Sequence, residues 1–157
     1  MSSARGANPI PRVYLDANVF ILAYESVGPE ALHAFAILEA IESGTIHGVT
    51  SELTLGEVLP GPFDANDAEL GQAYQNILTN GPDLTMVPVT RDILVSSAEL
   101  RAGKPGLKLQ DAIHCASALK ADCDYLVSDD RRIPKALGFT VVRFGPDSLT
   151  AILGPSV

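Results

Sequence analysis

The chain lacks several features by which common classes of protein are recognised. It has no tryptophan and only two cysteines, Cys115 and Cys123, among 157 residues. Two cysteines are too few for a disulfide framework, and their spacing does not match the short pairs of a zinc site. No apolar run approaches the roughly 20 residues of a membrane span, and the N-terminus has no signal-peptide core. We therefore expect a cytoplasmic protein that makes no contact with a membrane and keeps its thiols free.

Basic residues are also scarce, and they are unevenly distributed. The formal net charge is −8, which argues against a uniformly basic surface for nucleic acid. Residues 1–90 contain two basic and eleven acidic residues, whereas residues 91–157 contain nine basic and eight acidic ones. A surface that faces phosphate must therefore come from the second half. The candidates lie in one loop and after a pair of aspartates, unless they are ordinary solvated charges: Arg101, Lys104, Lys108, Arg131, Arg132 and Lys135.

The composition predicts one packed domain. It is 46% hydrophobic and 19% charged, without repeats or long polar tracts, and a chain of this length buries a core without disulfides. Only the ends look loose. We expect a flexible N-terminal extension over residues 1–11, the folded domain over 12–147 and a C-terminal tail over 148–157.

Hydrophobic periodicity predicts strands that alternate with helices. Such alternation indicates an α/β fold with a mainly parallel sheet covered on both faces. In the helix over residues 30–42 we expect Leu32, Phe35, Ala36, Leu38 and Ile41 to face inward. We expect strands near residues 12–15, 46–49, 84–89, 125–127 and 140–142, and helices over 18–24, 30–42, 51–59, 64–79, 92–100 and 109–121.

Four acidic residues stand out by their places in this pattern. Asp16 and Asp130 follow apolar strands, and ligands collect at strand ends in parallel sheets. Asp111 opens a helix, where a carboxylate is also favoured by the helix dipole alone. Glu57 lies among apolar residues of another helix, where it needs a partner if it is buried. Clustered carboxylates repel one another, so we expect a hard cation, Mg²⁺ or Mn²⁺, to hold them together.

The segments that carry these acids resemble a known family. LDANVF, SELTLGEV, LQDAIHCASAL and YLVSDDRRI are similar, in order and spacing, to the four motif regions of PIN-domain ribonucleases, particularly the VapC-type toxins of toxin–antitoxin systems. The resemblance covers about residues 13–143. It implies a PIN-like three-layer α/β/α domain and a metal-dependent endoribonuclease that hydrolyses RNA phosphodiester bonds.

The resemblance also implies roles for individual residues. Asp16, Glu57 and Asp111 match the acidic triad, and Asp130 matches the fourth acid, with Asp129 as the alternative ligand beside it. Asn18 and Ser128 match supporting positions, and His114 matches a packed helix residue. A cognate antitoxin and a homodimer are the partners that the family implies.

Two alternatives stay open. A phosphatase of the haloacid dehalogenase type could use Asp16 as nucleophile with Thr50 and the pair Asp129 and Asp130, although Asn18 stands where that family has its general acid. A PIN scaffold that binds RNA or a protein without cutting is the other, although such a module has no need for a costly cluster of carboxylates.

Overall fold

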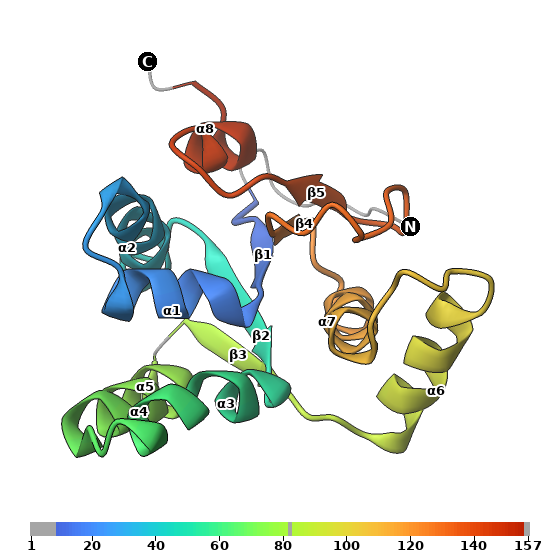
Figure 1. Cartoon of the computed structure of the whole chain (residues 1–157). Coiled ribbons are helices and arrows are strands. Elements are labelled where there is room, and N and C mark those ends of the chain that lie inside the picture. Colours follow the sequence, from blue (N-terminus) through green and yellow to red (C-terminus); the bar gives the residue numbers. More distant parts are fainter. Residues whose placement is uncertain (1–8, 82, 156–157) are drawn as a thin grey trace.

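The computed structural model describes residues 9–81 and 83–155, and its centre is a sheet of five parallel strands in the order β3-β2-β1-β4-β5 (Figure 1). The remaining residues, including most of the expected N-terminal extension, lie outside the described part. Each neighbouring pair of strands is parallel. The strands are β1 (Arg12–Leu15), β2 (His47–Ser51), β3 (Leu84–Val87), β4 (Tyr125–Val127) and β5 (Thr140–Val142).

Helices cover both faces of this sheet. The helices up to α5 lie to one side in Figure 1, and α6 and α7 lie to the other, so the predicted three-layer α/β/α architecture is confirmed. None of the helices in the described part is long and apolar enough to cross a membrane. The helices are α1 (Ala17–Glu25), α2 (Pro29–Glu42), α3 (Leu53–Val58), α4 (Pro60–Asp64), α5 (Ala68–Asn80), α6 (Arg91–Arg101), α7 (Leu109–Lys120) and α8 (Ser148–Leu153).

The central strand contributes to two separate cores because its side chains alternate between the faces. Val13 and Leu15 pack in the cluster with residues of α1, α2 and α5. Tyr14 points the other way, into the cluster that contains Ile113 and Ala116 of α7. All three strand side chains have no exposed surface. This burial on both faces accounts for the continuous apolar run at β1.

The order of the strands creates a switch point at the centre of the sheet. From β1 the chain moves outward to β2 and β3, then returns to the other side of β1 to form β4 and β5. Connections therefore leave β1 and β4 in opposite directions and leave room between them, which is where ligands bind in open α/β sheets. Asp16 directly follows β1, and the segment from Ser128 to Asp130 follows β4.

The predicted inward face of α2 is wrong in part. Leu32 and Phe35, which we expected to be buried, are 71% and 43% exposed. Alanines form most of the buried stripe, together with Ile37 and Ile41. Small side chains allow α2 to pack closely on its neighbours, so this packing overrides the preference for burying the larger residues. The buried alanines of α2 are Ala31, Ala34 and Ala40.

The prolines after Glu57 do not end the helical region as expected. Helix α3 ends at Val58, but α4 begins at Pro60, because the fixed φ of proline suits the first position of a helix. The predicted helix over 64–79 starts only at Ala68, where the Asp67 side chain accepts a hydrogen bond from the Leu70 N–H at 3.0 Å. Helix α8 lies within the expected C-terminal tail, and its Ile152 packs in the core.

Candidate active site

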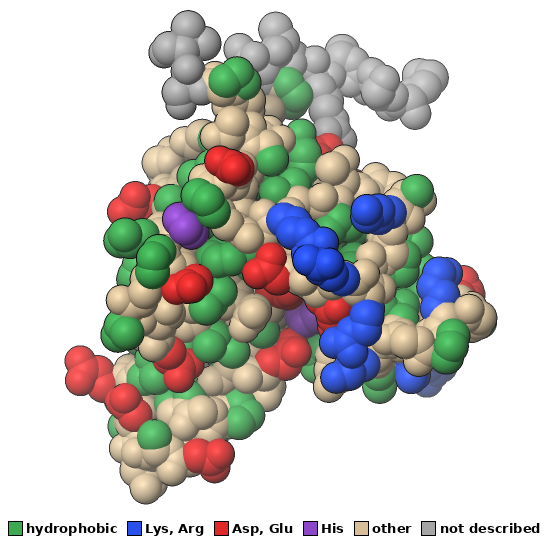
Figure 2. Space-filling view, turned by 45° about the horizontal axis from the view of Figure 1, so that its top comes forward, with side chains coloured by type: hydrophobic (Ala, Val, Ile, Leu, Met, Phe, Trp, Pro, Cys, Tyr) green, Lys and Arg blue, Asp and Glu red, His purple; other side chains and the backbone are tan. Residues whose placement is uncertain are grey.

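One hollow at the switch point brings together the acids that the sequence singled out. It has a volume of about 310 Å³ and is called the acidic hollow below. Asp16 comes from the end of β1, Glu57 from α3, Asp111 from the first turn of α7 and Asp130 from the segment after β4. The full lining is Asp16, Ala17, Asn18, Ile21, Glu57, Asp111, His114, Ser128, Asp129 and Asp130. Figure 2 shows acidic side chains gathered near the middle of this face, with basic side chains beside them.

Asp16 is fixed at the start of α1. Its Oδ1 accepts a hydrogen bond from the Asn18 backbone N–H at 3.1 Å, which makes it the N-cap of the helix. Burial raises the pKa of Asp16, and a hydrogen bond from Ser128 and the charge of His114 oppose that rise. The Asn18 side chain is exposed at the rim. The N-cap role therefore accounts for one oxygen of Asp16, while its burial near the other acids disfavours the ionised form.

Asp111 is the least satisfied acid of the hollow. Its Oδ2 atom is buried and has no hydrogen-bond partner in the part of the chain that the structure describes. Burial raises the pKa of Asp111, and the neighbouring Asp130 raises it further. Two carboxyl groups can share a hydrogen bond only when one of them carries a proton, so without a cation the pair favours protonation of Asp111.

Asp130 is instead held by a cation. Its Oδ1 accepts from the Arg132 backbone N–H at 2.9 Å and from the Arg132 Nε at 3.1 Å. Burial alone raises the pKa of Asp130, but the hydrogen bonds and charge of Arg132 outweigh it and lower the pKa. Asp129 also lines the hollow but is exposed. Of the two neighbours, Asp130 is the one that contacts Asp111.

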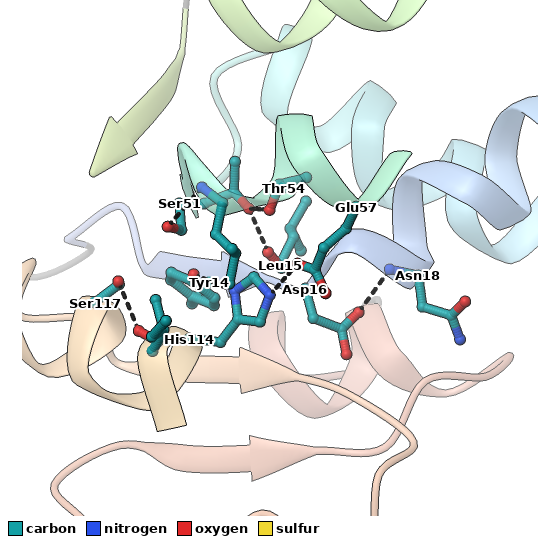
Figure 3. Close-up of polar contacts among 12 residues, drawn as sticks. Tyr14, Leu15, Asp16, Asn18, Ser51, Thr54, Glu57, His114 and Ser117 are labelled. Carbon is teal, nitrogen blue, oxygen red and sulfur yellow. Dashed lines mark hydrogen bonds and ion pairs between the residues drawn. The ribbon is translucent and has the colours of Figure 1, made fainter. Parts of the chain in front are cut away.

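Glu57 is bound by a chain of buried groups (Figure 3). Its Oε1 lies 2.6 Å from His114 Nε2, and His114 Nδ1 lies 2.6 Å from the Tyr14 hydroxyl. His114 is 4% exposed and Tyr14 is fully buried. The expectation that His114 is a packed helix residue therefore holds for its burial, but the sequence did not reveal its bond to Glu57. These two hydrogen bonds join three elements, β1, α7 and α3.

The two bonds of His114 define how its protons are placed. An ionised carboxylate only accepts hydrogen bonds, so Nε2 carries the proton that is donated to Glu57. In the neutral ring, Nδ1 then accepts the proton of the Tyr14 hydroxyl. The Glu57 carboxylate thus selects the tautomer of His114, the Tyr14 hydroxyl donates to the remaining ring nitrogen, and the bond from His114 sets the orientation of the Glu57 carboxylate.

The donor atoms suit a hard divalent cation. All four acids offer carboxylate oxygens, which are the ligands that Mg²⁺ and Mn²⁺ prefer. Asp111 Oδ2, a buried oxygen without a hydrogen-bond partner among the described residues, is a candidate metal ligand. Within residues 9–81 and 83–155, no three His, Cys, Asp or Glu side chains are already arranged as a closed metal site. Glu57 and Asp130 are instead directed towards His114 and Arg132.

The predicted basic residues separate into two groups. Arg101 donates from Nε to the Leu107 carbonyl at 3.0 Å, and Lys104 lines a different hollow between α6 and α7. Lys108 is the exposed residue that precedes α7. Arg131 and Arg132 lie beside the acidic hollow, but Arg132 is paired with Asp130. Only the second group lies directly next to the acids.

Sequence reasoning missed Arg143. It follows β5, whose Val142 pairs with Val127 of β4, and it therefore lies next to the segment that carries Asp129 and Asp130. Its Nη1 donates to the Asp129 carbonyl at 3.4 Å. The parallel pairing of β4 and β5 was the only available signal, because Arg143 belongs to no motif.

Thr50, which the phosphatase alternative needs, is not available to a ligand. It is fully buried, and its hydroxyl donates to the Leu15 carbonyl at 2.7 Å. The same hydroxyl lies 2.8 Å from Thr54 Oγ1. Thr50 thus ties β2 to β1 and α3, and it does not line the acidic hollow. This arrangement disfavours the phosphatase alternative.

The model of the PIN domain family matches residues 13–137. The chain belongs to the PIN domain family. This match extends from β1 to beyond β4 and so contains all four acids. No curated protein matches the sequence closely enough to add to this result.

Solved structures share this PIN fold at low sequence identity. A toxin–antitoxin complex from Klebsiella pneumoniae contains a chain of 24% identity and TM-score 0.62, and the match covers 83% of this PIN domain protein and 95% of that chain. VapBC2 from Rickettsia felis, bound to promoter DNA, gives 14% identity, TM-score 0.66 and coverage of 85% and 99%. VapC20 from Mycobacterium tuberculosis, a toxin that cleaves the sarcin-ricin loop, gives 17% identity and a TM-score of 0.64. That match covers 82% of this protein and 96% of the VapC20 chain.

The raised pKa of Asp111 predicts a pH-dependent stability. At a pH between the ordinary carboxyl pKa and the raised one, folding without metal takes up a proton at Asp111. The contribution of Asp111 to the free energy of unfolding is therefore fully present at acid pH and is lost as the pH rises through the raised pKa. Asp111→Asn cannot ionise. We expect it to increase the free energy of unfolding in EDTA at pH 7 by on the order of 1 kcal/mol after solvent screening, and by progressively less towards pH 4.

Urea denaturation across this pH range measures the difference. The matched control is Asp129→Asn, because Asp129 is the exposed neighbour in the same hollow, and we expect it to leave the pH profile unchanged. A wild type that is more stable than Asp111→Asn at pH 7 would contradict this electrostatic account.

The bond between Tyr14 and His114 predicts a stability cost. Tyr14→Phe removes the hydroxyl and leaves the buried His114 Nδ1 without a partner, which costs about 1–3 kcal/mol. Tyr125→Phe is the control, since the Tyr125 hydroxyl has no hydrogen-bond partner among the described residues, and we expect it to cost less than about 0.5 kcal/mol. Urea denaturation measures both. Equal small effects would show that the hydroxyl does not hold His114.

Proposed function

We propose that this PIN domain protein is a metal-dependent endoribonuclease that hydrolyses RNA phosphodiester bonds, and that it acts as the toxin of a type II toxin–antitoxin pair. One observation carries the proposal: four carboxylates from four separate elements line a single hollow at the switch point. Their mutual repulsion has a cost that a structural scaffold has no reason to bear. The toxin function is supported by the fold shared with chains of toxin–antitoxin complexes.

Asp16, Glu57, Asp111 and Asp130 would hold Mg²⁺ or Mn²⁺, with Asp129 at the rim as a further ligand. A bound divalent ion supplies water activation at neutral pH and stabilises charge on the phosphate oxygens. The protein's own contribution is orientation. His114 directs Glu57 into the hollow, Arg132 fixes Asp130, and Ser128 Oγ accepts from the Asp130 N–H at 3.0 Å. Substitution of such supporting residues commonly costs 10- to 100-fold in metal affinity or activity.

A protein partner fits the exposed side of α2. Leu32 and Phe35 expose apolar surface there, and a neighbouring hollow of about 570 Å³ between α2 and α5 has an apolar lining with Glu39, Glu42 and Asp83 among its residues. An apolar surface with acidic edges suits a partner that carries apolar and basic side chains. We propose that the cognate antitoxin is such a partner and that the protein itself pairs as a homodimer.

Cleavage of a fluorescent, single-stranded RNA of mixed sequence tests the enzymatic proposal. We expect activity with Mn²⁺ or Mg²⁺ and none in EDTA. Asp111→Asn and Glu57→Gln should each lower kcat by at least about 100-fold, since each removes a ligand of the cation, whose charge is worth several kcal/mol in the transition state. The matched controls, Asp92→Asn and Glu69→Gln, change exposed acids of α6 and α5 and should retain wild-type rates.

The outcomes separate the alternatives. Folded variants of Asp111 and Glu57 that still cleave would contradict the site. A wild type that binds RNA but never cleaves it with either ion would favour the non-catalytic scaffold. Transfer of labelled phosphate from a phosphate ester to Asp16 would favour the phosphatase.

A further inference from the structure

A second hollow lies against the acidic hollow and has the opposite electrostatic character. Its volume is about 470 Å³, and it shares Ser128 and Asp130 with the acidic hollow. The segment after Asp130 and the strand β5 form its walls. Three cations line it, Arg131, Lys135 and Arg143, and it is called the basic hollow below.

The positive charge of the basic hollow is available to a ligand. Within the described ranges, none of its three cations forms an ion pair with an acidic side chain. Among the described residues that line it, Asp130 is the single acid, and its carboxylate is already bound by Arg132. Arg143 is held in place by its bond to the Asp129 carbonyl. On a chain of net charge −8, such a group of unpaired cations attracts an anion locally.

The basic hollow also has a constrained wall. Ile133 and Phe139 anchor this wall in the hydrophobic core, where they are 7% and 6% exposed. Ala136, on the same wall, has a φ of +64°, a left-handed conformation that costs a non-glycine residue roughly 1–2 kcal/mol. A backbone strain of this kind persists only where the surroundings impose it, and it often accompanies a binding function.

We infer that the basic hollow binds the nucleotide next to the cleaved bond, with its phosphate on Arg131 and Arg143. The inference rests on the proposed ribonuclease function and adds a substrate site to it. Guanidinium groups form paired hydrogen bonds with phosphate oxygens. Because the hollows share Asp130, one RNA strand spans both, with the scissile phosphate among the acids and its neighbour among the cations.

Fluorescence anisotropy of an end-labelled, single-stranded RNA of mixed sequence tests this inference. The wild type is titrated in EDTA, where the proposed enzyme cannot cut, at several salt concentrations. We expect the double variant Arg131→Glu/Arg143→Glu to weaken binding at least tenfold and to reduce the slope of log K against log salt by about 0.7 for each phosphate group that the variant no longer binds. Both replaced side chains are exposed, and circular dichroism verifies the fold.

The matched control is Lys104→Glu, which reverses an exposed cation in the separate hollow between α6 and α7. We expect wild-type affinity and salt dependence. If Lys104→Glu and the double variant weaken binding equally, or neither does, the basic hollow is not the nucleotide site. An RNA affinity unchanged in the double variant, together with abolished binding of an acidic peptide, would assign the hollow to a protein and overturn the inference.

A cleavage assay with Mn²⁺ separates this inference from the proposed function. If the wild type cleaves RNA and the double variant retains its KM, the nuclease stands and the basic hollow inference fails. If the wild type binds RNA through the basic hollow but does not cleave, the site stands and the enzymatic proposal fails. If the wild type binds no RNA at all, both fail.

Discussion

The repulsion among four carboxylates at one end of the sheet is the constraint on which the site depends. Parallel strands with a switch point leave a gap at the carboxyl ends of β1 and β4, and the chain fills the edges of that gap with Asp16, Glu57, Asp111 and Asp130. Each acid comes from a different element. The fold therefore concentrates negative charge at one end of the sheet. Packing in the hydrophobic clusters on the two faces of β1 holds these elements in place and offsets the repulsion between the carboxylates.

The four acids divide into two kinds. Glu57 and Asp130 each have a partner that donates hydrogen bonds, His114 and Arg132 respectively. Within residues 9–81 and 83–155, neither Asp16 nor Asp111 forms an ion pair, and burial raises the pKa of both. The deficit of positive charge in the acidic hollow therefore falls on Asp16 and Asp111. A divalent cation would remove that deficit.

Much of the architecture follows from local signals in the sequence. Apolar runs with turn residues after them identified the strands at β1, β4 and β5, and strand ends followed by acids pointed to one edge of the sheet. The exposure of Leu32 and Phe35 was not predictable, because an alanine stripe and a stripe of larger residues are both compatible with the helical period of α2. The link between His114 and Glu57 and the position of Arg143 depend on tertiary packing across 57 and 14 residues respectively, which no local pattern encodes. Whether these acids bind metal or cut RNA stays a prediction from the site.

Calorimetric titration with Mn²⁺ at pH 7 tests the central claim that the four acids form one cation site. We expect the wild type and the control Asp92→Asn, which changes an exposed acid of α6, to bind Mn²⁺ equally well. Asp16→Asn, Glu57→Gln and Asp111→Asn should each weaken binding at least about tenfold, because each removes a charged ligand. A folded wild type that binds no Mn²⁺ would contradict this claim, and so would three variants that bind as tightly as the wild type.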